Sequence, residues 1–189
     1  GLSAADHHED ALSVKEAELS MKRRLGASAH DVLIAQSNLA GTYLALGRYE
    51  EALSMRRDIY SGRLEHNGED HERTMAAANN YAASLISLQR FEEVRSLLRK
   101  TIPVARRVLG ESNELTLRMK ALYARALYRA DDATLDDLRE AVTTLEDAGR
   151  IARRVMGGAH PLTVDIEDEL RDARAALRAR ETPPPAKSA

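Results

Sequence analysis

Histidines and carboxylates near the beginning of the chain are the first residues that could carry chemistry. His7 and His8 precede Glu9 and Asp10, and imidazole and carboxylate groups are common metal ligands. Adjacent side chains on a helix point apart, however, whereas residues three or four positions apart lie side by side. We therefore predict no metal site in this sequence.

Two pairs of adjacent glutamates could in principle act as a general acid and a general base. They are Glu50–Glu51 and Glu92–Glu93, and each pair stands at the expected beginning of a helix. The positive end of the helix dipole stabilises negative charge at such a position. We therefore predict a structural role for both pairs.

The sequence contains none of the short motifs that mark common catalytic or nucleotide sites. The glycine-rich phosphate loops, the HExxH zinc motif and the GxSxG nucleophile turn are all missing. The chain also has no cysteine, which excludes disulfides, thiol catalysis and zinc–thiolate sites. We expect no enzyme activity and no cofactor.

The composition favours packed helices. Of the 189 residues, 43% are hydrophobic but only 4% are aromatic, so alanine and leucine must form most of the core. The net charge of −2 gives no reason to expect nucleic acid or an anionic membrane as a partner. No stretch approaches the roughly 18 apolar residues that mark a membrane-spanning helix.

A repeat of 42 residues runs through the sequence. Residues 38–52 read NLAGTYLALGRYEEA, and residues 80–94 read NYAASLISLQRFEEV in the same register. Gly68 and Gly110 keep this offset, whereas Gly157 follows Gly110 by 47 residues. The extra residues lie near 131–135, where we predict a longer turn on the surface.

Each repeat divides into two helices. Apolar residues at helical spacing predict helices over residues 31–46, 49–64, 72–88, 91–109, 114–130, 135–156 and 162–180. Pro103 lies inside one of these helices and should kink it or remove a hydrogen bond. Four histidines fall at or near the turns between repeats: His30, His66, His71 and His160. No strand is predicted.

The residues of the repeat resemble a tetratricopeptide repeat. The resemblance lies in N-L-A-x-x-Y-x-x-x-G-R-Y-E-E-A at 38–52 and in H-P-x-T at 160–163. The period of 42, in place of the usual length of about 34, and the G-E-D-H turn at 68–71 resemble the kinesin-light-chain subtype. The resemblance implies an all-α fold: a right-handed α-solenoid of stacked antiparallel helix hairpins whose first helices line a concave peptide-binding groove.

We expect a single array over residues 1–181. It divides into a partial repeat at 5–26, repeats at about 27–67, 68–109 and 110–156, and a capping helix at 162–180. Gln89 departs from the pattern because the first repeat has the turn glycine Gly47 at this position. Residues 182–189 are rich in proline and should form an extended tail. No cap is obvious at the beginning, so we expect further repeats before Gly1 or a larger assembly that covers this end.

The resemblance also implies a set of groove residues on the first helix of each repeat. Family members use an asparagine at the position of Asn38 and Asn80 to hold a peptide backbone, and an amide suits this task because it both donates and accepts. The alternative is that these amides only join neighbouring helices. The full predicted set is Ile34, Asn38, Leu44, Asn79, Asn80, Ile86, Arg118, Arg125, Tyr128 and Arg129.

Three arginines of this set share one helix face because they lie at i, i+7 and i+11: Arg118, Arg125 and Arg129. One interpretation is a patch that binds an acidic ligand or a C-terminal carboxylate. The other is neutralisation by an acidic row of matching spacing in the last helix, made of Asp165, Asp168 and Asp172. We favour the second interpretation, and the sequence does not decide between them.

The expected function is a non-catalytic scaffold for protein–protein interaction. In this interpretation the concave groove binds a peptide segment of a partner protein. The alternative is a structural subunit of a larger assembly, held through its convex face or its open N-terminal end. An enzyme is the least favoured class, because no set of titratable residues converges.

Overall fold

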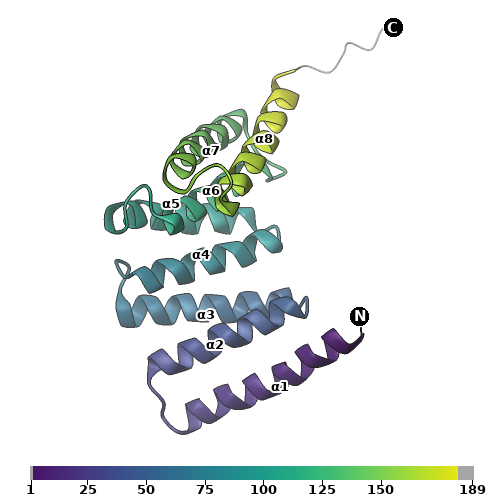
Figure 1. The fold of residues 1–189 in the computed structure, drawn as a ribbon, viewed down its shortest axis with the longest axis vertical. Helices are drawn as coiled ribbons and strands as arrows, with labels where there is room; N and C mark the ends of the chain where they lie inside the picture. Colours follow the sequence, from purple (N-terminus) through teal and green to yellow (C-terminus); the bar gives the residue numbers. More distant parts are fainter. Residues whose placement is uncertain (1, 183–189) are drawn as a thin grey trace. The chain divides into compact units, whose positions relative to one another are not determined.

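The structure, a computed structural model, describes residues 2–182, with side chains from residue 9 onward. This part of the chain forms helices and no strand (Figure 1), which confirms the predicted all-α class. The helices are α1 (Leu2–Arg24), α2 (Ala29–Ala45), α3 (Tyr49–Asn67), α4 (Glu72–Ser87), α5 (Phe91–Val108), α6 (Glu114–Tyr128), α7 (Leu135–Met156) and α8 (Pro161–Glu181). None of them is long and apolar enough to cross a membrane.

The predicted helices agree closely with the observed ones. The largest difference is at the end of α3, which continues to Asn67. Helix α5 runs without interruption through Pro103, whose side chain is exposed. The expected proline-rich tail at 182–189 lies outside the described residues, apart from Thr182.

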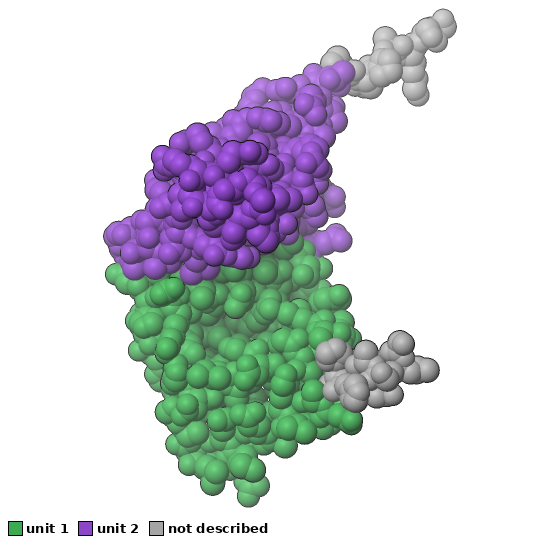
Figure 2. Space-filling view, in the orientation of Figure 1, with its two compact units in different colours: residues 1–88 green, residues 89–189 purple. Residues whose placement is uncertain are grey.

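The chain forms two compact units, shown in different colours in Figure 2: residues 1–88 with α1–α4, and residues 89–189 with α5–α8. Within each unit, every helix packs on the next one in the sequence, and α8 also contacts α6. Inside each unit, short turns join the helices, so successive helices of a unit are antiparallel (Figure 1).

Small residues let the helices of the first unit approach one another closely. A cluster between α1, α2 and α3 contains Leu12, Leu19, Ala35, Leu39, Tyr43 and Ala52. A second cluster, between α2, α3 and α4, contains Leu33, Ala40, Ile59 and Ala77. A Cβ atom on Gly62 of α3 would stand only 2.9 Å from a methyl group of Leu33, so a larger residue there would have to displace the Leu33 side chain.

In the second unit, leucine and alanine side chains fill the space between the helices, as the composition predicts. The fully buried side chains include Leu98, Leu117, Met119, Leu127, Leu145 and Ile166. The turn before α7 adds a smaller cluster of Ala130, Ala133 and Leu138, which packs against Phe91 and Leu177.

Side chains of the turns cap the helices that follow them. The Nδ1 atoms of His71 and His160 accept the backbone N–H groups of Arg73 and Leu162, at 3.1 and 3.3 Å. Two of the four turn histidines are therefore N-caps. In the longer turn, Thr134 and Asp137 form a reciprocal capping box. The extra residues of this turn are therefore followed directly by the capped N-terminus of α7.

The two glutamate pairs lie in the first turns of α3 and α5, as predicted. The Glu51 carboxylate accepts from Arg48 Nε at 2.7 Å, and the Glu93 carboxylate accepts from Arg90 Nε at 2.5 Å. The hydrogen bond from Arg48 lowers the pKa of Glu51. These contacts support the structural role.

A buried glutamate joins the last helix to the first helix of the preceding hairpin. Glu169 of α8 is only 7% exposed, and its carboxylate lies 2.6 Å from Arg125 Nη2 of α6. The Tyr128 hydroxyl donates to the same carboxylate at 2.6 Å. Arg129 is a more distant partner, at 3.6 Å. We call these four residues the Glu169 cluster.

In the turn before α5, Gln89 has a backbone conformation that is unfavourable for a residue with a side chain. Gly47 ends its turn with a φ of 72°, and Gln89, at the same repeat position, has a φ of 56°. A side chain is unfavourable in this left-handed region, whereas glycine adopts it freely.

Replacement of Gln89 by glycine should therefore stabilise the protein. We expect Gln89→Gly to raise the free energy of unfolding by about 0.5–1 kcal/mol, because relief of the strain outweighs the greater freedom of the unfolded chain. The matched change Gly47→Gln should lower it by a similar amount, since no atom lies within 4 Å of the added Cβ. Chemical denaturation measures both, and a less stable Gln89→Gly protein would contradict the argument.

The contacts of the Glu169 cluster should make the free energy of unfolding depend on pH. Burial, and next the hydrogen bond to Glu169, raise the pKa of Tyr128 to about 12. The Tyr128 hydroxyl ionises at a lower pH in the unfolded state than in the folded state. Its contribution to the free energy of unfolding is therefore complete below pH 10 and is lost as the pH rises through 12. Tyr128→Phe should lower the free energy of unfolding by about 1–3 kcal/mol at neutral pH.

The difference in free energy of unfolding between wild type and Tyr128→Phe, measured by denaturation, should narrow between pH 10 and 12. Tyr49→Phe is the control, because the Tyr49 side chain is exposed. An equal effect of the two substitutions at every pH would show that the cluster does not hold α8.

Candidate functional site

A hollow of about 300 Å³ lies between α2, α3 and α4 in the first unit, and we call it the α2/α4 hollow. Two of its lining residues belong to the predicted groove set: Ile34 on α2 and Asn80 on α4. Ile59, Ala76 and Ala77 add apolar surface. The hollow therefore includes surface from the first helices of two successive repeats.

Three basic side chains meet at one end of the hollow. The Nη1 atom of Arg63, on α3, lies 3.0 Å from the Nδ1 atom of His30, at the start of α2. The Nη1 atom of Arg73, at the start of α4, lies 3.1 Å from the same nitrogen. Guanidinium groups only donate hydrogen bonds, so the imidazole nitrogen is the acceptor for both.

Arg63 is buried without an acidic partner. Its exposed fraction is 7%, and no carboxylate of the described residues lies within 4 Å of Arg63 or Arg73. Burial, and next the positive charge of Arg73, lower the pKa of Arg63. An unpaired buried charge is unfavourable, and an anion in the hollow would offset this cost.

Local structure explains why these charges gather here. Thr74 Oγ1 donates to the Arg63 carbonyl at 3.1 Å and so ties the end of α3 to the start of α4. His30 and Arg73 stand in the first turns of α2 and α4, where the helix dipoles add positive potential. The end of the hollow can thus receive a carboxylate or another small anionic group.

Asn38 and Asn80 have free side-chain amides. The Asn80 carbonyl accepts from Arg56 Nη1 at 2.9 Å, and this arginine also donates to Ser84 Oγ at 2.8 Å. One repeat earlier, Lys15 Nζ lies 3.4 Å from the Asn38 carbonyl and donates to a threonine hydroxyl at 2.7 Å. A cation of the preceding helix therefore holds each backbone, while both exposed amides have no partner among the described residues.

The other predicted residues of the first unit lie outside the α2/α4 hollow. Leu44 is half-buried against the cluster between α1, α2 and α3. Ile86 is half-buried. Asn79 is half-buried as well, and its Oδ1 atom is buried without a hydrogen bond.

The predicted residues of the second unit mostly contact their own unit. Arg125, Tyr128 and Arg129 belong to the Glu169 cluster, whereas Arg118 pairs with Glu114 on its own helix at 2.6 Å. Pairing with the last helix is therefore what the structure shows for Arg125 and Arg129.

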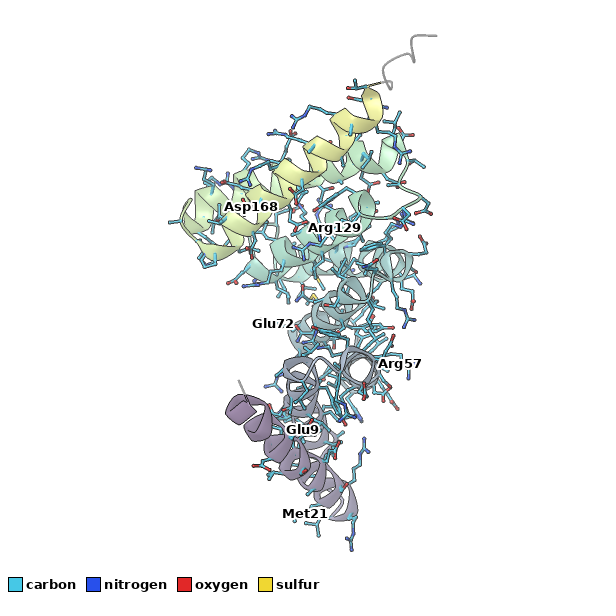
Figure 3. The ribbon with its side chains drawn as sticks, turned by 90° about the vertical axis from the view of Figure 1, so that its right-hand side faces the viewer. Glu9, Met21, Arg57, Glu72, Arg129 and Asp168 are labelled. Atoms are coloured by element: carbon cyan, nitrogen blue, oxygen red, sulfur yellow. The ribbon has the colours of Figure 1, made fainter. Side chains whose placement is uncertain are left out.

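The acidic partners differ from the expected row. Glu169 is the main partner, Asp172 lies 3.8 Å from Arg129, and Asp168 pairs with Arg171 instead. Figure 3 labels Arg129, directly after α6, and Asp168 on α8. The register of α8 explains the difference, because burial of Ile166 and Ala173 turns Glu169 toward α6.

The sequence analysis did not identify the basic end of the hollow. Arg63 lies on a second helix, and the repeat pattern assigns groove positions only to first helices. One signal was available: the residues three and four positions from Arg63 are Ile59, Tyr60, His66 and Asn67, so no local carboxylate can neutralise it.

The described side chains, from residue 9 to residue 182, contain no group of three or more residues that could hold a metal ion. His7 and His8 lie outside this range.

Comparison with known proteins agrees with the repeat pattern. Residues 31–106 match the family model for the tetratricopeptide repeat. No curated protein sequence matches the chain.

Solved structures show the same fold. The structure matches two crystal structures from Podosopora anserina, described as kinesin light chain nearly identical TPR-like repeats, one of them a single-residue variant. The variant has a TM-score of 0.76 at 22% identity, over 92% of this chain and 80% of that chain. The other has a TM-score of 0.73 at 22% identity, over 92% and 81%.

A further match is BtubC (BKLC) from P. vanneervenii, with a TM-score of 0.60 at 16% identity, over 97% of this chain and 79% of that chain. The repeat spacing, the family match and these structures agree. The chain has the fold of kinesin-light-chain-like TPR repeats, and residues 31–106 match the tetratricopeptide repeat family.

Proposed function

We propose that the first unit binds an extended segment of a partner protein along α2 and α4. A fold of tetratricopeptide repeats is in general a scaffold for protein–protein interaction, and nothing in the sequence indicates catalysis. The proposal adds a place and a chemistry: an acidic side chain or a terminal carboxylate of the segment enters the basic end of the α2/α4 hollow.

The burial of Arg63 without a carboxylate carries this proposal. Its guanidinium and that of Arg73 both approach His30, which is a weak substitute for an anion. A carboxylate there would accept charge-assisted hydrogen bonds from both arginines. The ligand thus supplies the negative charge that the unit lacks at this position.

The rest of the groove surface suits an extended backbone. The free amides of Asn38 and Asn80 can each donate to and accept from peptide groups, which recur along any extended segment. Ile34 is 42% exposed and offers an apolar contact between them. The amides support binding of many sequences, whereas the basic end selects an acidic residue.

Two sets of substitutions test the proposal. Asn38→Ala combined with Asn80→Ala should weaken peptide binding by roughly 10- to 100-fold, since each amide contributes about 1 kcal/mol or more. Arg73→Gln should weaken the binding of acidic peptides and reduce the salt dependence of their affinity. All three side chains are exposed, so helical content should not change.

The probe is a fluorescent library of extended peptides that carry a central Asp, with the matched Asn library as control. Anisotropy titrations at two salt concentrations should show preference for the Asp library, which Arg73→Gln removes. The control variant is Arg57→Gln, because Arg57 is exposed on α3 and does not line the hollow. Equal affinity for both libraries, or unchanged affinity in the double asparagine variant, would overturn the proposal.

A second candidate function is a structural subunit held through α1. Val14 is 68% exposed and Met21 is 61% exposed on one face of this helix, and Leu25 just after it is 77% exposed. Such an apolar stripe fits an interface with another helix. If it is one, Val14→Glu with Met21→Glu should abolish association in sedimentation velocity and leave peptide affinity unchanged. A monomeric wild type would exclude self-association through this face.

A further inference from the structure

A second hollow, of about 450 Å³, lies between α7 and α8 in the second unit, and we call it the α7/α8 hollow. Gly149 and Leu170 are its uncharged lining. The other lining residues are five arginines and two glutamates, a formal net charge of +3: Arg150, Arg153, Arg171, Arg174, Arg178, Glu146 and Glu167. This basic surface is separate from the α2/α4 hollow and from the Glu169 cluster.

The α7/α8 hollow occupies the same repeat position as a hollow between α5 and α6. The repeat offset here is 47 residues, and Thr116 and Thr163, which keep it, are both fully buried. Six pairs of lining residues match at this offset: Arg99 with Glu146, Ile102 with Gly149, Pro103 with Arg150, Arg106 with Arg153, Lys120 with Glu167, and Tyr123 with Leu170.

In the earlier repeat, a third helix covers this position. Helix α7 adds Glu140, Thr143, Thr144 and Asp147 to the hollow between α5 and α6. The Asp147 carboxylate accepts from Lys120 Nζ at 2.9 Å, and the Glu140 carboxylate accepts from the Tyr123 hydroxyl at 2.9 Å. The covering helix is thus held by acidic residues seven positions apart, and so on one face.

No third helix covers the α7/α8 hollow within the described residues. Four of its five arginines form ion pairs at the surface, and these include Arg150 with Asp147 and Arg171 with Asp168 on their own helices. Arg174 pairs with Glu146 at 2.6 Å, Arg153 pairs with Glu167 at 3.0 Å, and both pairs are largely exposed. Arg178 has no acidic partner among the described residues. Exposed ion pairs contribute at most about 1 kcal/mol each, so a partner carboxylate can compete for these arginines.

We propose that the α7/α8 hollow docks an amphipathic helix of a partner protein that carries acidic residues on its docking face. The helix would take the place that α7 has in the preceding repeat. Its apolar side chains would contact Leu170 and Gly149. Its acidic side chains would meet Arg171, Arg174 and Arg178, which lie at i, i+3 and i+7 on α8 and so form one row.

The lining favours a protein helix over nucleic acid. Glu146 and Glu167 stand inside the hollow and would repel a phosphate backbone, whereas a helix can direct its carboxylates to the arginines alone. The uncharged contact at Leu170 also suits a side chain better than a phosphate. The equivalent position in the preceding repeat holds a helix with acidic residues on the buried face.

The test uses the full 189-residue protein. The probe is a fluorescent, helix-stabilised peptide of about 18 residues, or five turns. It carries Glu at i, i+3 and i+7 and Leu and Ala on the adjoining stripe. The control peptide has Gln in place of each Glu. We expect the Glu peptide to bind about tenfold more tightly than the Gln peptide, and the difference to fall with added salt.

Arg171→Glu combined with Arg178→Glu should remove binding of the Glu peptide and create binding of the corresponding Lys peptide. This variant keeps the two ion pairs between α7 and α8, and circular dichroism checks its folding. Arg57→Glu is the matched control, because Arg57 is an exposed arginine in the first unit. It should leave the affinity for the Glu peptide within about twofold of wild type.

Five outcomes would overturn the proposal. Equal loss of binding in Arg57→Glu means unspecific attraction, and unchanged binding in the Arg171/Arg178 variant places the helix elsewhere. A DNA duplex that binds more tightly than the Glu peptide and is lost in the same variant identifies nucleic acid as the ligand. Self-association that this variant abolishes identifies a second copy of the chain. If the Arg73→Gln variant no longer binds the Glu peptide, the peptide binds at the α2/α4 hollow instead. That result is compatible with the proposed function.

Discussion

Close contact between helices through alanine is the constraint on which the rest of the structure depends. Helices α2 and α6 each pack on the helix before and the helix after, so their contact positions must be small. Ala40, Ala82 and Ala124 occupy the same position in successive repeats, and each is almost completely buried. With so little aromatic surface, one hairpin buries too little apolar area to be stable alone, and stacking is the source of stability.

Polar contacts between the helices then differ from repeat to repeat. In the first unit, Arg56 holds the backbone of α4 through a carbonyl and leaves the Asn80 amide free. In the second unit, Glu169 draws Arg125 and Tyr128 into contacts within the unit. Asn80 and Glu169 occupy the same repeat position, which therefore has a free amide in one unit and serves helix packing in the other.

The two basic hollows follow from the same principle. Arg63 lies where its neighbours on α2 and α4 are basic, so the charge has no partner in the unit. The arginines of α7 and α8 lie where the preceding repeat has a covering helix. In both places the contacts that a regular repeat would make are incomplete, and this is where a partner protein can contribute its own groups.

The sequence by itself determined the period, the helix boundaries and the fold class, because turn glycines, N-caps and helical spacing are local properties. It also predicted that Ile34 and Asn80 share one surface, since both follow from the repeat register. It did not predict the meeting of His30, Arg63 and Arg73, which come from three different helices and whose side chains depend on how α3 packs between α2 and α4. Nor did it select Glu169 over Asp165 and Asp168, because burial of Ile166 and Ala173 decides the rotation of α8. Only tertiary packing sets such a rotation, and a turn of one residue changes which charge faces the neighbouring helix.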